Sequence, residues 1–402
     1  MAKTKTTAKS KRDAKPVKRT AKKPVQPAAH AAAAGSRPLR VGLIGAGWIS
    51  TVHYDALKAI GGCEVVAQAD IDPDRLKAFG ESRPVRDYYP SHHELLKRKD
   101  IDVVTVAVPN RLHAPLTLDV LKAGKHVIVE KPLCLTIAEA EEIVDLSRRK
   151  GLVVGYGEEL CYVPKFVRMK QIADSGALGD VYMVKQTEKH SGPYSPWFWT
   201  REGAGGGILM DMGCHAIEFC RWFMGKKPIK SVWAHCAKYL HTWAEVEDHV
   251  ILTFEFADGA LAHVESSWAL QGGMASRAEA YGTKGVIYGD LLQGMGLACF
   301  TPDGYPEMPG NRALVGGPAA CGWTVPDYEW LWNNGYPQEM RDFLDCIRTG
   351  GTPIESAQDG LEVLEIMLAA YHSAGTGKRV ALPFRPNLSI PVDLWLSPRQ
   401  DL

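Results

Sequence analysis

Short continuous apolar runs alternate with segments of helical periodicity in the first part of the chain. The apolar runs lie in "PLRVGLIGAG", "CEVVAQADID", "IDVVTVAVPN", "KHVIVEKP" and "LVVGYG", and the segments between them repeat their apolar residues every three or four positions. Strands without polar alternation that are separated by helices predict a parallel sheet buried on both faces. Right-handed crossovers then give a doubly wound α/β domain, which we expect over residues 39–157.

The pattern changes after Gly157. A helix is expected at about 162–175, and it is followed by alternating or aromatic runs: "VYMVKQTEKH", "KSVWAHCAKYL", "DHVILTFEFADG", "LAHVESSWAL" and "RAEAYGTKGVIYGD". The dipeptide Asp258-Gly259 between two such runs indicates a hairpin. Helices are expected again over 336–350 and 356–374. The sequence therefore predicts an α+β domain over residues 158–402 with a large, open, mostly antiparallel sheet, and a Pro-rich extension at 383–402 without a core of its own.

The charge is distributed unevenly along the chain. Residues 1–40 hold twelve of the 47 Lys and Arg residues and one of the 46 acidic residues, so the rest of the chain is acidic. Large apolar residues are almost absent from residues 1–38, which are expected to be a disordered basic tail. The tail is interpreted as a solubilising arm, with contact to nucleic acid or a partner as the alternative. Nucleic-acid binding by the acidic folded body is not expected.

Hydropathy and cysteine usage limit the class of protein further. No apolar stretch approaches the roughly 18 residues of a membrane span, so no membrane contact is expected. The nine cysteines are odd in number and form no C-x-x-C motif, which favours neither a disulfide framework nor a metal site. A reducing, cytoplasmic location fits this usage best.

The first predicted strand ends in a dinucleotide-binding pattern. "VGLIGAGWIS" reads G-x-G-x-x-S, with Gly45 for the tight turn and Gly47 for close approach of a pyrophosphate, and Ser50 departs from the usual Gly or Ala. Its position before a helix N-terminus predicts anion binding by that turn, which includes Trp48 and Ile49.

The second predicted strand ends at the residues that select the cofactor. Asp70 is placed to accept hydrogen bonds from ribose hydroxyls, and its charge would repel a 2′-phosphate, which favours NAD over NADP. Arg75 keeps the opposite choice open, because an arginine there can bind a phosphate.

Two further stretches carry residues suited to chemistry. In "HVIVEKPLCLT", Lys131 follows a strand directly, where open parallel sheets bind ligands. In "GAGGGILMDMGCHAIEFCRWFMG", Asp211 and His215 lie one helical turn apart in an apolar helix, so the pair is expected to be partly buried. A surface charge pair and a charged turn are the plain structural alternatives.

The glycine pattern, "AGKHVIVEKP" and "GGG-x-L-x-D-x-G-x-H", in this order, resemble the Gfo/Idh/MocA family over residues 39–380. The resemblance implies a Rossmann domain, an open-faced sheet domain and NAD(P)-dependent redox chemistry at a sugar or polyol carbon. It identifies Lys131, Asp211 and His215 as catalytic residues. It also places four residues at the cofactor, together with Lys131: Pro109, Asn110, His113 and Glu130.

Oxidation of a secondary alcohol needs a base for the hydroxyl proton while a hydride leaves. His215 is the expected base, oriented by Asp211, and Lys131 is expected to stabilise developing alkoxide charge. Lys131 is the alternative proton acceptor if burial lowers its pKa.

Seven residues are candidates for substrate contact, with core or oligomer packing as the alternative for the tryptophans and Tyr336: Glu158, His190, Tyr194, Trp197, Trp199, Arg201 and Tyr336. The stretch "HSGPYSPWFWTR" offers aromatic faces for a sugar ring. Many relatives carry an Arg or Asn where this chain has Glu158-Glu159, and the loss of a cation disfavours an anionic substrate.

The sequence therefore predicts an NAD-dependent dehydrogenase of a neutral sugar, glycoside or cyclic polyol. The alternatives are a glycoside-cleaving enzyme that uses bound NAD for transient oxidation and elimination, and a non-catalytic NAD-binding regulator. A homodimer or homotetramer is expected.

Overall fold

The structure is a computed structural model that describes residues 37–292, 299–301, 322–324 and 329–398. Residues 1–36 of the predicted basic tail lie outside the described residues. The prediction of disorder there is therefore not tested.

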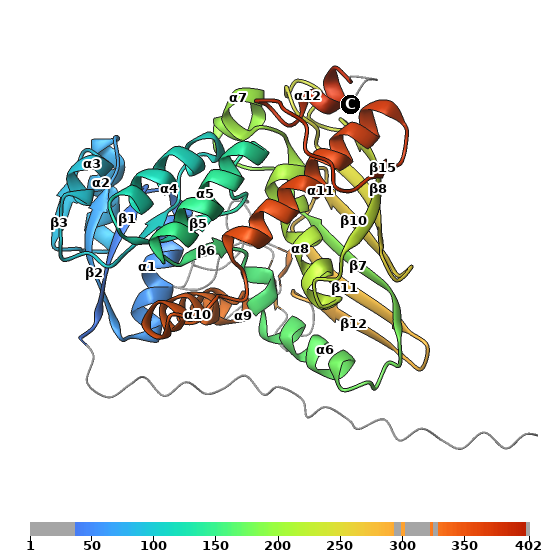
Figure 1. The fold of residues 1–402 in the computed structure, drawn as a ribbon, viewed down its shortest axis with the longest axis horizontal. Coiled ribbons are helices and arrows are strands. Elements are labelled where there is room, and N and C mark those ends of the chain that lie inside the picture. Colours follow the sequence, from blue (N-terminus) through green and yellow to red (C-terminus); the bar gives the residue numbers. More distant parts are fainter. Residues whose placement is uncertain (1–36, 293–298, 302–321, 325–328, 399–402) are drawn as a thin grey trace, which may run out of the picture. The chain divides into compact units, whose positions relative to one another are not determined.

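Residues 39–157 form the predicted parallel sheet, in the order β3-β2-β1-β4-β5-β6 (Figure 1). Its strands are β1 (Leu39–Ile44), β2 (Cys63–Ala69), β3 (Asp87–Tyr89), β4 (Val103–Val106), β5 (His126–Glu130) and β6 (Val154–Gly157). Its helices are α1 (Trp48–Ile60), α2 (Pro73–Ser82), α3 (His92–Leu96), η1 (Asn110–Leu112), α4 (His113–Lys122) and α5 (Ile137–Lys150). The doubly wound α/β prediction is confirmed, whereas the short elements β3 and α3 were not predicted because three to five residues show no periodicity.

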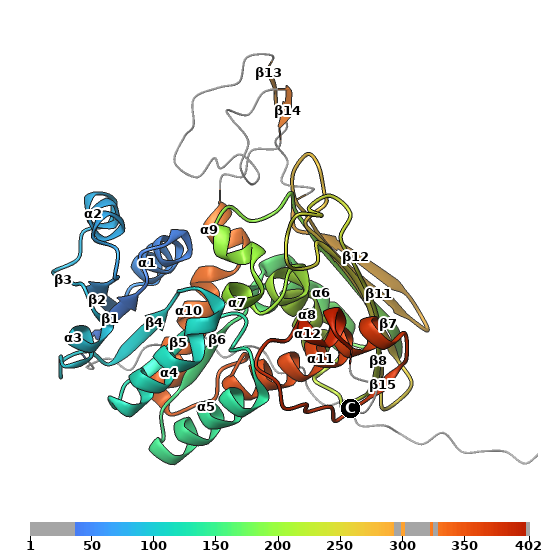
Figure 2. The same cartoon turned by 90° about the horizontal axis from the view of Figure 1, so that it is seen from above.

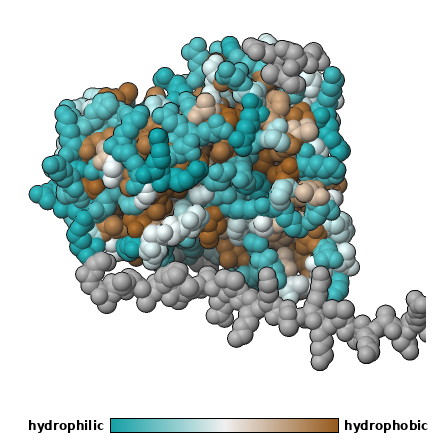
Figure 3. Space-filling model, in the orientation of Figure 1, coloured by the Kyte–Doolittle hydropathy of each residue, from teal (hydrophilic) through white to brown (hydrophobic). Residues whose placement is uncertain are grey.

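Local sequence explains the element boundaries well. Helix α5 begins at a capping box, in which Thr136 and Glu139 bond each other's backbone N–H groups, and it ends at Gly151 in the left-handed conformation. Its outer side carries exposed charged residues. The space-filling view in Figure 3 accordingly shows mainly hydrophilic residues over the side of the molecule where Figure 1 draws α4 and α5.

A seven-stranded sheet follows, in the order β12-β11-β7-β10-β9-β8-β15. Its strands are β7 (Val181–Lys189), β8 (Ile229–Ala237), β9 (His249–Phe256), β10 (Leu261–Ser267), β11 (Ala275–Gly282), β12 (Val286–Asp290) and β15 (Val380–Ala381). All pairs are antiparallel except β7 with β10, so the mostly antiparallel prediction is confirmed. The hairpin around Asp258-Gly259 joins β9 and β10, but "RAEAYGTKGVIYGD" forms two strands rather than one run. A separate two-stranded pair consists of β13 (Cys299–Thr301) and β14 (Gly322–Thr324).

Helices cover one face of the seven-stranded sheet. The remaining helical elements are η2 (Glu159–Tyr162), α6 (Pro164–Asp174), η3 (Pro196–Trp199), α7 (Arg201–Ala204), η4 (Leu209–Gly213), α8 (Cys214–Phe223), α9 (Trp330–Asn333), α10 (Tyr336–Thr349), α11 (Ala357–Thr376) and α12 (Asp393–Leu396). Helix α11 packs against β8 on one side and against β6 and α5 on the other (Figure 2). One hydrophobic core therefore extends across both sheets. The predicted division into domains at residue 157 stays a prediction.

The C-terminal helices and extension return to the rest of the fold. Helix α10 packs beside α1, and the Phe343 ring lies where a side chain at Gly155 of β6 would be. In the Pro-rich extension, Val392 and Leu394 are buried. These residues pack on a surface formed by the rest of the fold, so the extension is anchored without a core of its own.

Candidate active site

The turn after β1 has the geometry of a dinucleotide cradle. Gly45 adopts φ +98°, and a Cβ there would lie 2.0 Å from the Ala107 carbonyl oxygen, so only glycine fits. The Cβ position of Gly47 has no atom within 4 Å, which leaves open space in front of the N-terminus of α1. Both features fit a dinucleotide whose pyrophosphate approaches the backbone.

Asp70 lies beside this turn, as predicted. Its carboxylate accepts hydrogen bonds from the backbone N–H groups of Ala46, at 2.6 Å, and Asp72, at 2.8 Å. Arg75 lies on α2 with its guanidinium 3.2 Å from the Asp72 carboxylate. The Asp70 carboxylate is therefore fixed next to the cradle, whereas the Arg75 guanidinium is paired with Asp72.

Aromatic residues flank the cradle. The exposed Trp48 ring lies 5.8 Å from the ring of Trp330, which lies 5.6 Å from the buried ring of Tyr336. Ile49 packs against the core. Trp330 was not predicted, because its helix α9 is four residues long and far from the glycine turn in sequence.

Several predicted cofactor residues have protein partners. Glu130 pairs with His53 of α1 at 2.8 Å, and the Asn110 amide donates to the Ala204 carbonyl at 3.0 Å. The ring nitrogens of His113 lie 2.6 and 2.8 Å from the carbonyl oxygens of Pro132 and Val108. Pro109 precedes η1. These contacts fix the carboxyl ends of β4 and β5, and direct cofactor contact by these residues stays a prediction.

Lys131 and Asp211 form the centre of the site. The Lys131 ammonium group donates to Asp211 Oδ1 at 3.0 Å and to its backbone carbonyl at 2.8 Å. Burial lowers the pKa of Lys131, but the surrounding negative groups, Asp211 first among them, together outweigh burial and leave this pKa above its ordinary value. Burial raises the pKa of Asp211, but the charge and hydrogen bond of Lys131 and those of His190 together outweigh burial, so this pKa lies below its usual range. Lys131 is therefore held charged, with 16% of its side chain exposed.

Two further donors reach Asp211. Trp268 Nε1 donates to Oδ2 at 3.0 Å, and His190 Nε2 lies 3.4 Å from the same oxygen. His190 Nδ1 accepts the Gly192 N–H, so the ring proton lies on Nε2 and points at Asp211. His190 was predicted near the site and is there. Trp268 was missed, although it follows a strand end in "VESSWAL".

The partner of His215 is Glu158. His215 Nδ1 lies 2.7 Å from Glu158 Oε1, and both side chains are almost wholly buried. The prediction that Asp211 orients His215 is wrong, because an ammonium group and two N–H donors already surround the Asp211 carboxylate. Burial lowers the pKa of His215 to about 4. Burial, and then the charge of Glu218, raise the pKa of Glu158 well above its usual range.

Glu159 follows Glu158 directly after β6, but its carboxylate has a different environment from that of Glu158. Its carboxylate is 3.5 Å from His215 Nδ1, and no described residue donates a hydrogen bond to it. Its side chain keeps 15% of its surface exposed. Burial raises the pKa of Glu159 to about 7.

A buried glutamate holds the segment that carries Asp211 and His215. Glu247 accepts hydrogen bonds from the Gly207 N–H, the Leu209 N–H and the Tyr371 hydroxyl, at 2.7 to 3.1 Å. A side chain at Gly207 would lie 1.8 Å from the Glu247 carbonyl oxygen. Glycine is therefore required at position 207 for this contact. Asp211 itself lies in the π-helical turn η4, a feature often found at functional sites.

The remaining substrate candidates differ in position. The Trp199 ring packs 4.9 Å from the ring of Trp268, which itself binds Asp211. The Trp197 ring stacks on that of Phe198. Tyr194 is exposed. The Arg201 guanidinium binds the Asp393 carboxylate at 2.7 to 2.9 Å, so its charge is paired there rather than directed at a substrate. Whether Tyr194, Trp197 and Trp199 contact substrate stays a prediction.

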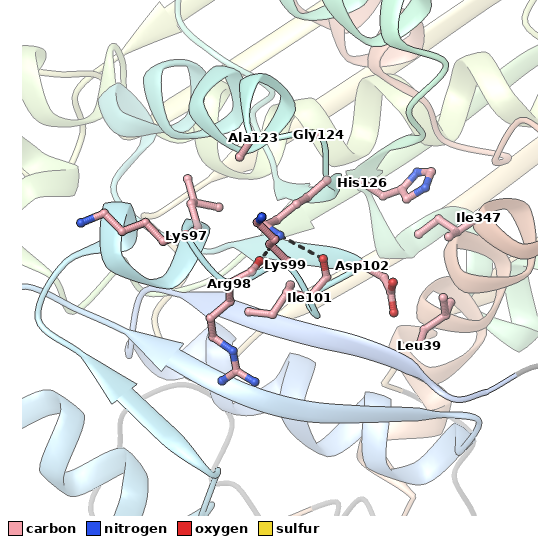
Figure 4. Close-up of a pocket in the computed structure, with 12 residues that line it drawn as sticks. Leu39, Lys97, Arg98, Lys99, Ile101, Asp102, Ala123, Gly124, His126 and Ile347 are labelled. Carbon is pink, nitrogen blue, oxygen red and sulfur yellow. Dashed lines mark hydrogen bonds between the residues drawn. The ribbon is translucent and has the colours of Figure 1, made fainter.

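A cavity of about 650 Å³ lies at the other edge of the parallel sheet, beside the amino ends of β1, β4 and β5. Its lining includes Lys97, Arg98, Lys99 and Asp102 (Figure 4). The Lys125 ammonium group there donates to the carbonyls of Arg98 and Ile101. This cavity is basic but remote from Lys131, so it is not the active site.

Comparison with known proteins gives the family. The family model described as "Oxidoreductase family, NAD-binding Rossmann fold" (GFO/IDH/MocA) matches residues 39–158. The model of the GFO/IDH/MocA C-terminal domain matches residues 166–288. The solved structure of GenD2 from gentamicin A biosynthesis, in complex with NAD, has 34% identity and a TM-score of 0.81 over 87% of this chain and 97% of its own. The chain belongs to the GFO/IDH/MocA family. It is an NAD-binding oxidoreductase.

Two curated relatives extend this comparison. Myo-inositol 2-dehydrogenase of Thermotoga maritima is 27% identical, over 86% of this chain and 98% of its own length. D-glucoside 3-dehydrogenase of Escherichia coli is 28% identical, over 86% and 98%. Among the described residues of this family member, no helix has the length and apolar character required to cross a membrane.

Proposed function

We propose that this family member oxidises a secondary alcohol of a sugar or polyol with NAD, and that Lys131 and His215 act on the reacting hydroxyl. The observation that carries the proposal is geometric: at the carboxyl edge of the parallel sheet, Lys131 is bound to Asp211 at 3.0 Å and His215 to Glu158 at 2.7 Å. The names of the relatives, an inositol dehydrogenase and a glucoside dehydrogenase, support the substrate class.

NAD bound at the glycine turn supplies the acceptor for the hydride from the alcohol carbon. Lys131 donates hydrogen bonds to the substrate oxygen and stabilises the negative charge that develops on it. Because Asp211 keeps Lys131 protonated, Lys131 is an unsuitable proton acceptor. His215 is then the base, as the sequence indicated.

Glu158 sets the form of His215 that can act. When Glu158 is ionised, it accepts the proton on Nδ1 and leaves Nε2 with a lone pair for the hydroxyl proton. When Glu158 is protonated, it donates to Nδ1, and Nε2 then carries the ring proton and cannot accept another. Oxidation therefore requires that the pair lose its extra proton, and Glu158 is a positioning residue for His215.

The test is a substrate panel. Sugars, inositols and glycosides are offered with NAD, and NADH formation is measured together with glycoside cleavage. Stoichiometric NADH formation with the glycoside intact supports dehydrogenation. Cleavage without NADH accumulation would favour the eliminating enzyme, and NAD binding without turnover of any substrate would favour a regulator. The same titration with NADP tests the preference assigned to Asp70.

Self-association and a cytoplasmic location are part of the same proposal. The seven-stranded sheet exposes Tyr182, Trp233 and Tyr288 by 54%, 43% and 65%, and a second copy that covers this sheet would bury them. Light scattering on the purified protein would identify a dimer or tetramer. The described cysteines are free thiols, in keeping with a reducing compartment.

A further inference from the structure

We infer that the substrate carries an ammonium group close to the hydroxyl that is oxidised, and that Glu159 and Glu339 bind it. This inference rests on the proposed function and narrows it from sugars and polyols in general to amino sugars and aminocyclitols. The sequence pointed to an uncharged ligand from the loss of a cation at residues 158 and 159. The structure shows in addition that carboxylate oxygens of Glu159 and Glu339 lack hydrogen-bond donors among the described residues.

Glu159 is the first of these acceptors. It lies 3.5 Å from the base His215, and part of its side chain is open to the site. Among the residues that the structure describes, its carboxylate has no hydrogen-bond donor, whereas neighbouring Glu158 has His215 and Glu130 has His53. A carboxylate so close to the reacting hydroxyl can reach a substituent on an adjacent ring carbon.

Glu339 is the second acceptor. It lies one turn into α10, is 1% exposed, and its Oε1 has no hydrogen-bond partner. The N-terminus of α10 abuts η2, since a Cβ at Gly335 would lie 2.7 Å from the Glu159 carbonyl oxygen. Burial, and then the charges of Glu159, Glu130 and Glu158, raise the pKa of Glu339 well above its usual range. A buried acceptor without a donor is costly, so its position beside the site points to a ligand that supplies N–H groups.

The charges around the site favour a cation over other ligands. Lys131 is paired with Asp211 rather than with Glu159 or Glu339. Burial and neighbouring carboxylates raise the pKa of both glutamates, and a bound cation would offset this by favouring their ionised forms. An ammonium group offers three N–H donors and one positive charge, which match acceptors that lack both. A phosphate or carboxylate would instead meet like charges. A divalent metal is the competing cation, because Glu158, Cys214 and His215 lie close enough together to hold one.

The experiment compares matched substrates. For each ring position of a methyl glycoside, three compounds are assayed with NAD: the hydroxyl sugar, the amino sugar and its N-acetyl derivative, which keeps the nitrogen but loses the charge. At one position the wild type should prefer the amino sugar about tenfold or more in kcat/KM over both controls, the usual size of a charge-assisted hydrogen bond to a partly buried carboxylate.

Variants then assign the preference to these residues. In Glu159→Gln, and again in Glu339→Gln, the ratio of kcat/KM for amino sugar to N-acetyl sugar should fall toward one. Glu142→Gln, an exposed residue of α5, is the matched control and should keep the wild-type ratio. The wild-type ratio itself does not depend on whether a variant folds.

Three results would overturn the inference. If hydroxyl sugars are oxidised at least as well as amino sugars at every position, the ammonium site is wrong, while NADH formation still upholds the proposed function. An amino-sugar preference that survives in both glutamine variants excludes these acceptors. Loss of activity with a chelator and recovery with zinc would show that the carboxylates hold a metal. If no sugar of either kind forms NADH, the proposed function fails as well.

Discussion

The cofactor turn and the catalytic cluster lie at the same edge of the parallel sheet but are built differently. At the cofactor turn, Gly45, Gly47 and Asp70 lie just after the two adjacent strands β1 and β2, and the backbone N–H of Ala46 binds Asp70 directly. In the catalytic cluster, His215 is bound by Glu158 and Asp211 by Trp268, and each pair is 57 residues apart. A site made of backbone from one βαβ unit can be read from spacing, whereas side chains from distant segments cannot.

The largest expected effect lies in the catalytic cluster. Lys131→Met should lower kcat by about 10²- to 10³-fold, because it removes a preorganised charge from the developing alkoxide. The dissociation constant of NAD should change little, since the glycine turn and Asp70 do not depend on Lys131. Stopped-flow turnover and a binding titration measure the two effects separately.

Lys97→Met is the control for loss of a lysine, because Lys97 lies at the opposite sheet edge (Figure 4). It should retain wild-type turnover. Wild-type turnover in Lys131→Met would return Lys131 to the role of a charged turn residue. A large loss of NAD affinity would instead show that the two regions are not separable.

The fold was predictable where periodicity is long. The strands around "VTVAVP" and "HVIVE" and the helix around "EAEEIVDLSRR" were found because many residues repeat one pattern. The features that were not predicted share a cause: β3, α3 and α9 have three to five residues, and the packing of Val392 and Leu394 depends on a surface formed elsewhere.

The candidate site was predictable by residue type but not by pairing. Helical spacing placed Asp211 next to His215, and both do line the site. It gave no information on which oxygen binds which nitrogen, because Lys131, His190 and Trp268 come from three other segments. Glu158 was predicted as a lost cation and a candidate for substrate contact, not as the partner of His215, since hydrogen-bond partners leave no mark in a single sequence.

Substitution of Glu247, which holds the segment that carries Asp211 and His215, should have the next largest effect, on the stability of the fold rather than on the rate. Glu247→Leu removes the acceptor of two buried backbone N–H groups and of the Tyr371 hydroxyl, at a cost of about 3 kcal/mol in the free energy of unfolding. Chemical denaturation measures this loss. Tyr371→Phe removes only one of these bonds and should cost about 1 kcal/mol. Equal stability of Glu247→Leu and wild type would mean that the segment is held by packing alone.

The pairing of His215 can be tested by pH. Because the folded pKa of Glu158 is raised, kcat/KM for oxidation should rise as pH increases through that pKa and the pair loses its proton, and should fall below it. The glutamine in Glu158→Gln cannot ionise, so this acidic limb of the pH profile of kcat/KM should disappear. In the same variant kcat should drop about tenfold or more.

Asp211→Asn is the matched comparison. It should lower the rate through Lys131 and leave the pH limb of the Glu158–His215 pair in place. A limb that survives in Glu158→Gln but vanishes in Asp211→Asn would restore the pairing expected from the sequence.

The smallest effect concerns cofactor choice, and it tests the cofactor turn itself. The Asp70 carboxylate is fixed by the N–H groups of Ala46 and Asp72, so it cannot move away from a 2′-phosphate. Two like charges about 4 Å apart cost roughly 4 kcal/mol at an effective dielectric constant of about 20. A quarter of that, about 1 kcal/mol, already favours NAD about fivefold. Arg75 is engaged with Asp72 and does not offset this repulsion. Asp70→Ala should therefore narrow the gap by strengthening NADP binding while NAD binding weakens slightly, as measured by titration of both cofactors. Tighter binding of NADP than NAD by the wild type would show that Arg75 leaves Asp72 and governs the pocket, and that even the better-predicted region depends on a side-chain pairing.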